Sequence, residues 1–282
     1  MVSQGLGLAS GKESLAWRVI SAGAALPLLL LVVLLGSPWL TAVVGVVTAL
    51  AVFEYYRLFK NSPVRHLLMP GLLWAFLFIA NAHLVANRHI GGSWTLLLVA
   101  GGLLLLLVPY ISVARSSRFL KGWLLAAGGP LYLGFTLSYV LLLRELEQGT
   151  QWLVLALFSA FATDTGAFFV GRAFGRHRMA PRISPGKTWE GAAAGLLAGI
   201  ATALLLDTLF GLPLILLEAA LVGLGASLAA QGGDLVESAL KRYVGAKDTG
   251  RLIPGHGGVL DRLDSVVLSL VLVYYGAQWV LP

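Results

Sequence analysis

The sequence lacks cysteine entirely, and only 12% of its 282 residues are charged. The absence of cysteine excludes disulfide bonds and thiol chemistry, and it leaves the redox compartment unassigned. A soluble domain normally carries about 25% charged residues, whereas 58% of this chain is hydrophobic. Apolar runs of about 20 residues recur, and each could cross the ~30 Å hydrocarbon core of a bilayer. The composition therefore predicts a polytopic membrane protein.

The short alternating segments typical of a transmembrane barrel are also absent. In lipid every backbone polar group needs a partner within the protein, so the spans are expected to be helices. We predict an all-α fold with about nine transmembrane helices. Their expected bounds are 17–35, 38–56, 67–85, 94–113, 122–143, 151–170, 190–210, 213–230 and 264–281.

The basic residues predict the orientation of these spans. With the N-terminus in the cytoplasm, every Lys and Arg except Arg88 and Arg144 falls in an inside segment. Cytoplasmic loops of membrane proteins carry such an excess, so we expect a multi-pass protein of the cytoplasmic (inner) membrane with its C-terminus outside. The net charge of +7 suits anionic lipid headgroups, and we expect no nucleic-acid partner.

Acidic residues divide the chain into two parts. Residues 1–150 contain almost no intramembrane acid, and we interpret them as a scaffold that offers a lipid groove and dimer contacts. Residues 151–282 contain Asp164 within a span, followed by polar inside segments at 171–189 and 231–263. An ionisable residue inside a span is a functional candidate, so this second part is the predicted catalytic region.

The first polar motif is the sequence QGGDLVESALKR. If it is helical, spacings of three, four and seven residues put Asp234, Glu237, Ser238 and Lys241 on one face. Such a face can hold a divalent cation and a phosphate together. The alternative is a solvated amphipathic helix.

The second motif is Asp261-Arg262-Leu263-Asp264 at the start of the last span. The spacing lets both carboxylates point the same way, and Mg²⁺ commonly binds through one or two carboxylates plus substrate phosphates. The alternative is that these acids only cap the helix N-terminus and interact favourably with the helix dipole. Capping explains Asp261, but it explains Asp264 less well, since Asp264 lies a full turn into the helix.

Two loops carry phosphate-binding features. The glycine-rich turn Pro254–Gly258 would let backbone N–H groups approach a phosphate, or it is a flexible connection; His256 within it is a base or a hydrogen-bonding partner. The segment Ser184–Thr188 resembles the end of a Walker A loop, but Pro181 occupies the required first glycine position. A P-loop is therefore rejected, although Lys187 remains a candidate phosphate contact.

The polar residues between Ser238 and Asp264 resemble the signature of the phosphatidate cytidylyltransferases. Upstream, the sequence from Asp164 to Gly191 resembles a second common block of that family, whereas over the first half of the chain the resemblance is only topological. The signature positions met here are Ser238, Lys241, Arg242, Lys247, Asp248, Gly250, Ile253, Pro254, His256, Gly257, Gly258, Asp261, Arg262 and Asp264.

The resemblance implies that CTP and phosphatidate react to CDP-diacylglycerol and pyrophosphate. It also implies a Mg²⁺ requirement, a homodimer and an active site open to the cytoplasm. A second cation, divalent or K⁺, is compatible with two phosphoryl-bearing substrates. The acyl chains are expected in a groove between helices that opens to the bilayer.

On this basis we assign roles to individual residues. The expected Mg²⁺ ligands are Asp234, Asp261 and Asp264, which with Ser238 and Lys241 form the predicted catalytic group. The expected substrate-binding residues are Asp164, Lys187, Arg242, Lys247, Asp248, His256, Gly257, Gly258 and Arg262.

Two other functions remain open at this point. A CTP-dependent polyprenol or dolichol-type lipid kinase would release CDP instead of pyrophosphate. An anionic-solute transporter would use Asp164 and the basic loops, but the acids of this chain cluster on one side and no internal repeat is evident.

Overall fold

The computed structural model describes residues 27–87, 94–113, 119–250 and 257–281. These residues are mostly helical, and eight of their helices are long and apolar enough to cross a membrane. The prediction of a mostly helical protein with several long apolar helices is confirmed. Of the predicted first span, residues 17–26 lie outside the described residues, and residues 27–35 are helical.

The helices are connected by short segments, one of which is a hairpin. A 3₁₀ turn, η1 (Pro63–Leu67), precedes α3, and a π-helical turn, η2 (Pro130–Phe135), joins α5 and α6 into one span. Two short antiparallel strands, β1 (Arg178–Ala180) and β2 (Ser184–Thr188), lie between α7 and α8. The helices are α2 (Trp39–Leu58), α3 (Leu68–Ala86), α4 (Thr95–Val113), α5 (Phe119–Gly129), α6 (Thr136–Arg144), α7 (Gly149–Phe174), α8 (Trp189–Phe210), α9 (Leu216–Tyr243), α10 (Leu260–Leu263) and α11 (Val266–Val280).

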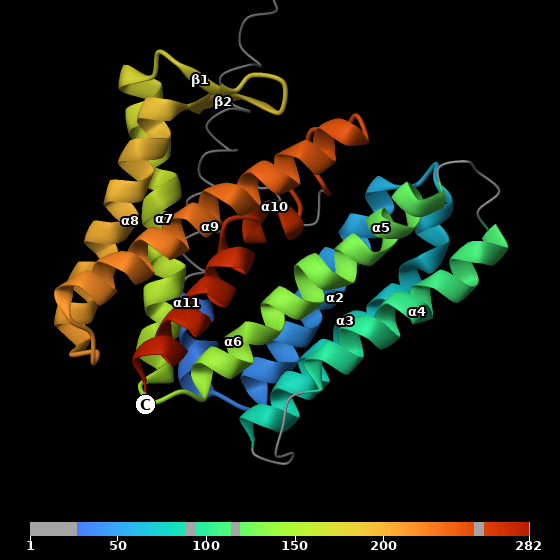
Figure 1. Ribbon diagram of the computed structural model, residues 1–282, viewed down its shortest axis with the longest axis horizontal. Helices are drawn as coiled ribbons and strands as arrows, with labels where there is room; N and C mark the ends of the chain where they lie inside the picture. The colour runs from blue at the N-terminus through green and yellow to red at the C-terminus, as the bar shows by residue number, and fades with distance from the viewer. Residues whose placement is uncertain (1–26, 88–93, 114–118, 251–256, 282) are drawn as a thin grey trace, which may run out of the picture.

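The helices form two neighbouring groups (Figure 1). Helices α2 to α6 make one group, and α7, α8, α9 and α11 make the other. Helix α11 contacts α6, α7 and α9, so it joins the two groups. The β1–β2 hairpin lies beyond the ends of α7 and α8, at the end of the molecule where α9 terminates near α5 (Figure 1).

Helix α9 is longer than the sequence analysis predicted. The expected span ended at residue 230, but the helix continues to Tyr243 and contains 28 residues, which is about 42 Å at 1.5 Å per residue. No proline interrupts residues 231–243, and their polar side chains find partners on neighbouring elements. The first polar motif therefore lies on a helix, which is the condition under which its spacing places the four polar residues on one face.

Small residues allow α7 and α8 to approach closely. Gly191, Gly195 and Gly199 are spaced four apart, so they form one stripe on α8 that faces α7. A Cβ atom at Gly191 would lie 2.7 Å from the carbonyl oxygen of Ala167, and one at Gly195 would lie 2.7 Å from that of Thr163. Close backbone packing of this kind stabilises helix pairs in lipid. The hydrophobic effect does not drive helices together there, because acyl chains are as apolar as the side chains.

We expect Gly195→Ala to destabilise the fold by about 1–3 kcal/mol, because the new methyl group must displace the α7 backbone. Thermal unfolding in detergent measures the effect. Gly101→Ala is the matched control, since nothing lies within 4 Å of its Cβ position and alanine is the better helix former by about 0.5–1 kcal/mol. An unfolding temperature of Gly195→Ala equal to that of Gly101→Ala would contradict the packing argument.

Candidate active site

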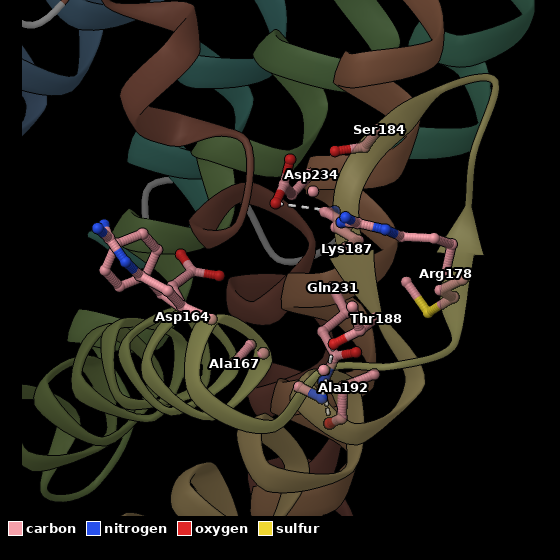
Figure 2. A pocket seen from close by; sticks show the side chains of 16 residues that line it. Asp164, Ala167, Arg178, Ser184, Lys187, Thr188, Ala192, Gln231 and Asp234 are labelled. Atoms are coloured by element: carbon pink, nitrogen blue, oxygen red, sulfur yellow. Dashed lines mark hydrogen bonds and ion pairs between the residues drawn. The ribbon is translucent and has the colours of Figure 1, made fainter.

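A polar cavity of about 670 Å³ lies between α7, the β1–β2 hairpin, α8 and α9. Asp164 of α7, Lys187 of β2 and Asp234 of α9 line it. Figure 2 shows Lys187 and Asp234 in contact and the Asp164 carboxylate pointing toward the same space. The structure thus brings Asp164 and the predicted polar segment 171–189 together with Gln231 and Asp234 of the predicted polar segment 231–263.

The hairpin positions Lys187 and closes one side of the cavity. Arg178 pairs with Thr188 across the two strands. Thr188 then caps α8, because its Oγ1 accepts a hydrogen bond from the backbone N–H of Gly191 at 3.1 Å. Arg242 of α9 donates to the carbonyl oxygen of Ile183 at 3.1 Å, which fastens the turn of the hairpin to α9.

Three carboxylates converge beside this cavity. Oxygen atoms of Asp234, Glu237 and Asp264 all lie within 4.8 Å of one another. Asp234 and Glu237 are one turn apart on α9, and Asp264 comes from the junction of α10 and α11. Carboxylate oxygens are the ligands that Mg²⁺ prefers, so the donor set fits a divalent cation.

Two lysines pair with acids of this region. The Nζ atom of Lys187 lies 2.8 Å from Oδ2 of Asp234. The Nζ atom of Lys241 lies 2.6 Å from Oε2 of Glu237 and 2.9 Å from Oδ1 of Asp261. The Glu237 side chain is fully buried, and those of Lys241 and Asp261 are 15% and 8% exposed. The two ion pairs of Lys241 therefore lie largely out of water, where they are screened little, whereas Lys187 and Asp234 are 20% and 32% exposed.

Asp261 holds the loop before α10. Its Oδ2 accepts hydrogen bonds from the backbone N–H and the hydroxyl of Thr249, at 3.0 and 2.9 Å, and from the N–H of Gly258 at 2.8 Å. Both of its oxygens thus have protein donors. Its assignment as a metal ligand stays a prediction. Glu237, which the sequence analysis placed on the same helix face but not among the ligands, occupies the carboxylate cluster.

The remaining predicted site residues include one that contacts the carboxylate cluster, one glycine of the loop before α10, one residue outside the described part of the chain and four exposed residues. Ser238 donates from its Oγ to Oδ1 of Asp234 at 3.3 Å, and Gly257 has a φ of +84°, the left-handed region that glycine tolerates. His256 lies outside the described residues. The exposed predicted residues are Arg242, Lys247, Asp248 and Arg262.

Tyr132 is a residue that the sequence analysis did not identify. Its hydroxyl hydrogen bonds to the carbonyl oxygens of Gly233, at 3.1 Å, and Asp264, at 3.2 Å, so it touches the backbone of two segments that supply carboxylates. The same side chain lines an apolar groove of about 720 Å³ between η2, α9 and α11. No sequence signal marks Tyr132, because it stands in an apolar run far from either polar motif.

The chain is similar to known proteins over most of its length. The sequence model described as "Cytidylyltransferase family" matches residues 16–280. A phosphatidate cytidylyltransferase of Brucella suis is 38% identical over 259 residues, which cover 86% of this chain and 89% of the relative. Those of Bacillus subtilis and Mycobacterium bovis are each 32% identical, and the matches cover 92% and 94% of this chain and 96% and 88% of the relatives.

We expect Lys241→Met to destabilise the protein by about 3 kcal/mol, because it leaves Glu237 and Asp261 without their shared cation. Thermal unfolding in detergent measures the loss. Lys247→Met removes the same charge from an exposed position and should leave the unfolding temperature nearly unchanged. Equal unfolding temperatures for the two variants would argue against the buried ion pairs.

Proposed function

This chain belongs to the cytidylyltransferase family, and from that premise we propose that it transfers the cytidylyl group of CTP to phosphatidate. The products are CDP-diacylglycerol and pyrophosphate. The observation that supports this function best is the position of the carboxylate cluster between a polar cavity and an apolar groove. A reaction between a nucleotide and a lipid needs both kinds of binding surface at one reacting centre.

The polar cavity suits the triphosphate of CTP. Arg172, Arg178 and Lys187 line it, and phosphoryl transfer depends mainly on positioning and on neutralising phosphate charge. Lys187 contacts Asp234, so a phosphate bound by Lys187 lies next to the carboxylate cluster. The arginines on α7 and β1 would bind the phosphates farther from that cluster.

The carboxylates of Asp234, Glu237 and Asp264 would hold Mg²⁺, which neutralises phosphate charge when it is bound. We propose that Asp261 serves this cluster through Lys241 and the loop, since its own oxygens already accept protein hydrogen bonds. A second cation, divalent or K⁺, remains part of the proposal.

The reaction needs no covalent intermediate with the protein. A phosphate oxygen of phosphatidate forms a bond with the α-phosphorus of CTP, and the bond from that phosphorus to the oxygen bridging to the β-phosphate breaks. Pyrophosphate leaves with the bonding electrons. A phosphate monoester is already anionic near neutral pH, so no strong general base is needed, and the side chains of the cavity orient the reactants.

The apolar groove suits the acyl chains of the lipid. Apart from Tyr132 and Thr136, the residues that line it are apolar or glycine, and they come from α5, η2, α9 and α11. Tyr132 stands where the groove meets the backbone of Gly233 and Asp264. A lipid with its tails in the groove would present its phosphate to the carboxylate cluster.

The setting of the site completes the proposal. We place the polar cavity on the cytoplasmic side of the inner membrane, with the N-terminus inside and the C-terminus outside. The distribution of Lys and Arg along the chain supports this orientation, and CTP is a cytoplasmic substrate. The homodimer implied by the family signature is also part of the proposal.

The test is incubation of the purified protein with CTP, Mg²⁺ and phosphatidate, followed by pyrophosphate detection and lipid mass measurement. We expect pyrophosphate and CDP-diacylglycerol in equal amounts. Asp234→Asn should lower turnover by roughly 100-fold or more, because it removes a charge at the reacting centre. Release of CDP would instead indicate a lipid kinase, and counter-flow transport in liposomes without CTP turnover would indicate a transporter.

A second experiment tests the groove. We expect Leu228→Trp, which narrows it, to raise the KM for phosphatidate about tenfold and to leave the KM for CTP unchanged, because the bulk opposes only the acyl chains. Leu205→Trp is the matched control on α8, since Leu205 is 58% exposed and Leu228 53%. An unchanged lipid KM in Leu228→Trp would remove the groove from the proposal.

A further inference from the structure

Glu54 is a buried acid whose role the proposed reaction does not explain. It lies near the end of α2, in the part of the chain that otherwise contains almost no intramembrane acid, and it is only 2% exposed. Its Oε2 accepts a hydrogen bond from the backbone N–H of Leu260 at 2.9 Å and from the hydroxyl of Thr249 at 3.4 Å. Burying an acid in a membrane protein is costly unless the acid has polar partners.

The Glu54 carboxylate also packs directly against the loop backbone. A Cβ atom placed on Gly250 or on Gly258 would collide with it. Both ends of the segment 249–260 are thus held by one side chain of α2. Only glycine at these two positions leaves room for the carboxylate to reach the N–H of Leu260, a residue that is itself fully buried.

Thr249 hydrogen bonds to both Glu54 and Asp261, and Gly258 packs against Glu54 while it hydrogen bonds to Asp261. Thr249 donates its hydroxyl to Oδ2 of Asp261 at 2.9 Å and lies 3.4 Å from Oε2 of Glu54. Gly258 donates its N–H to Asp261 while its Cα faces Glu54. Thr249 and Gly258 therefore lie between two carboxylates, one from each half of the chain, and Asp261 continues the contact to Lys241 and Glu237.

We propose that Glu54 is a positioning residue of the reaction, which acts through Thr249 and Leu260 to set Asp261 and Lys241 against the carboxylate cluster. Glu54 lines neither the polar cavity nor the apolar groove. The expected effect of Glu54 on kcat rests on the proposed function. Its effect on the carboxylate cluster does not depend on which reaction occurs there.

Two variants of Glu54 distinguish the role of its side chain as a hydrogen-bond acceptor from its role in filling space. Glu54→Gln keeps the volume and an oxygen acceptor for Leu260, whereas Glu54→Met keeps approximately the volume and removes the acceptor. Thr48→Val is the matched control, because Thr48 is a fully buried polar residue of the same helix outside the contacts of the loop. All variants are compared by unfolding temperature and by size-exclusion profile in detergent.

We expect Glu54→Met to lower kcat about 10–100-fold, as the loss of outer contacts to metal ligands does, with the KM for phosphatidate within about twofold of the wild type. Glu54→Gln should restore kcat to within about threefold. A kcat of Glu54→Met equal to that of Thr48→Val overturns the proposal, and so does an equal loss in Glu54→Gln and Glu54→Met. If Glu54→Met does not fold, Thr249→Val replaces it, and an unchanged kcat in that variant is equally decisive.

Binding of Mn²⁺, followed by electron paramagnetic resonance without substrates, distinguishes this proposal from the proposed function. We expect Glu54→Met to weaken Mn²⁺ binding about tenfold and Glu54→Gln to preserve it. If the wild type binds Mn²⁺ but produces no pyrophosphate from CTP and phosphatidate, the proposed function fails while Glu54 is still tested. Unchanged Mn²⁺ affinity in Glu54→Met overturns the positioning role even where the enzyme is active.

Discussion

The ammonium group of Lys241 connects Glu237 of α9 with Asp261 of α10. It lies 2.6 Å from Glu237 one turn earlier on α9, and 2.9 Å from Asp261 at the start of α10. Without this cation the buried carboxylates would repel one another across a region of low dielectric constant. The loop before α10 depends on Asp261, and the loop is also fastened to α2. Ion pairs and hydrogen bonds thus link α9, the residues Thr249, Gly258 and Leu260, and α2.

Such a network requires an environment that excludes water yet supplies polar partners. Helix α9 provides it by continuing beyond the expected span to Tyr243, so that an apolar helix in its first half carries a polar face in its second half. The β1–β2 hairpin covers part of that face and contributes Lys187. The glycine stripe of α8 brings α7 close enough for Asp164 to line the same cavity.

Gly233 lies where the polar cavity and the apolar groove approach each other along α9. Gln231 and Asp234 line the cavity, Gly232 lines the groove, and the carbonyl oxygen of Gly233 accepts a hydrogen bond from Tyr132. A Cβ atom at Gly233 would collide with the backbone carbonyl oxygen of Asp264. The absence of a side chain there allows α9 and the start of α11 to approach, and this approach brings Asp234 and Asp264 within 4.8 Å.

The sequence by itself determined the membrane class, the helical spans and the two polar regions, because apolar run length and charge distribution are local properties of the chain. Helical spacing likewise placed Asp234, Glu237, Ser238 and Lys241 on one face. Only the tertiary structure decided which acids meet. It grouped Glu237 with Asp234 and Asp264, engaged Asp261 with Lys241 and the loop, and brought Glu54 and Tyr132 to the site from the first half of the chain. Contacts between residues on different helices depend on how those helices pack, and neither spacing nor composition carries that information.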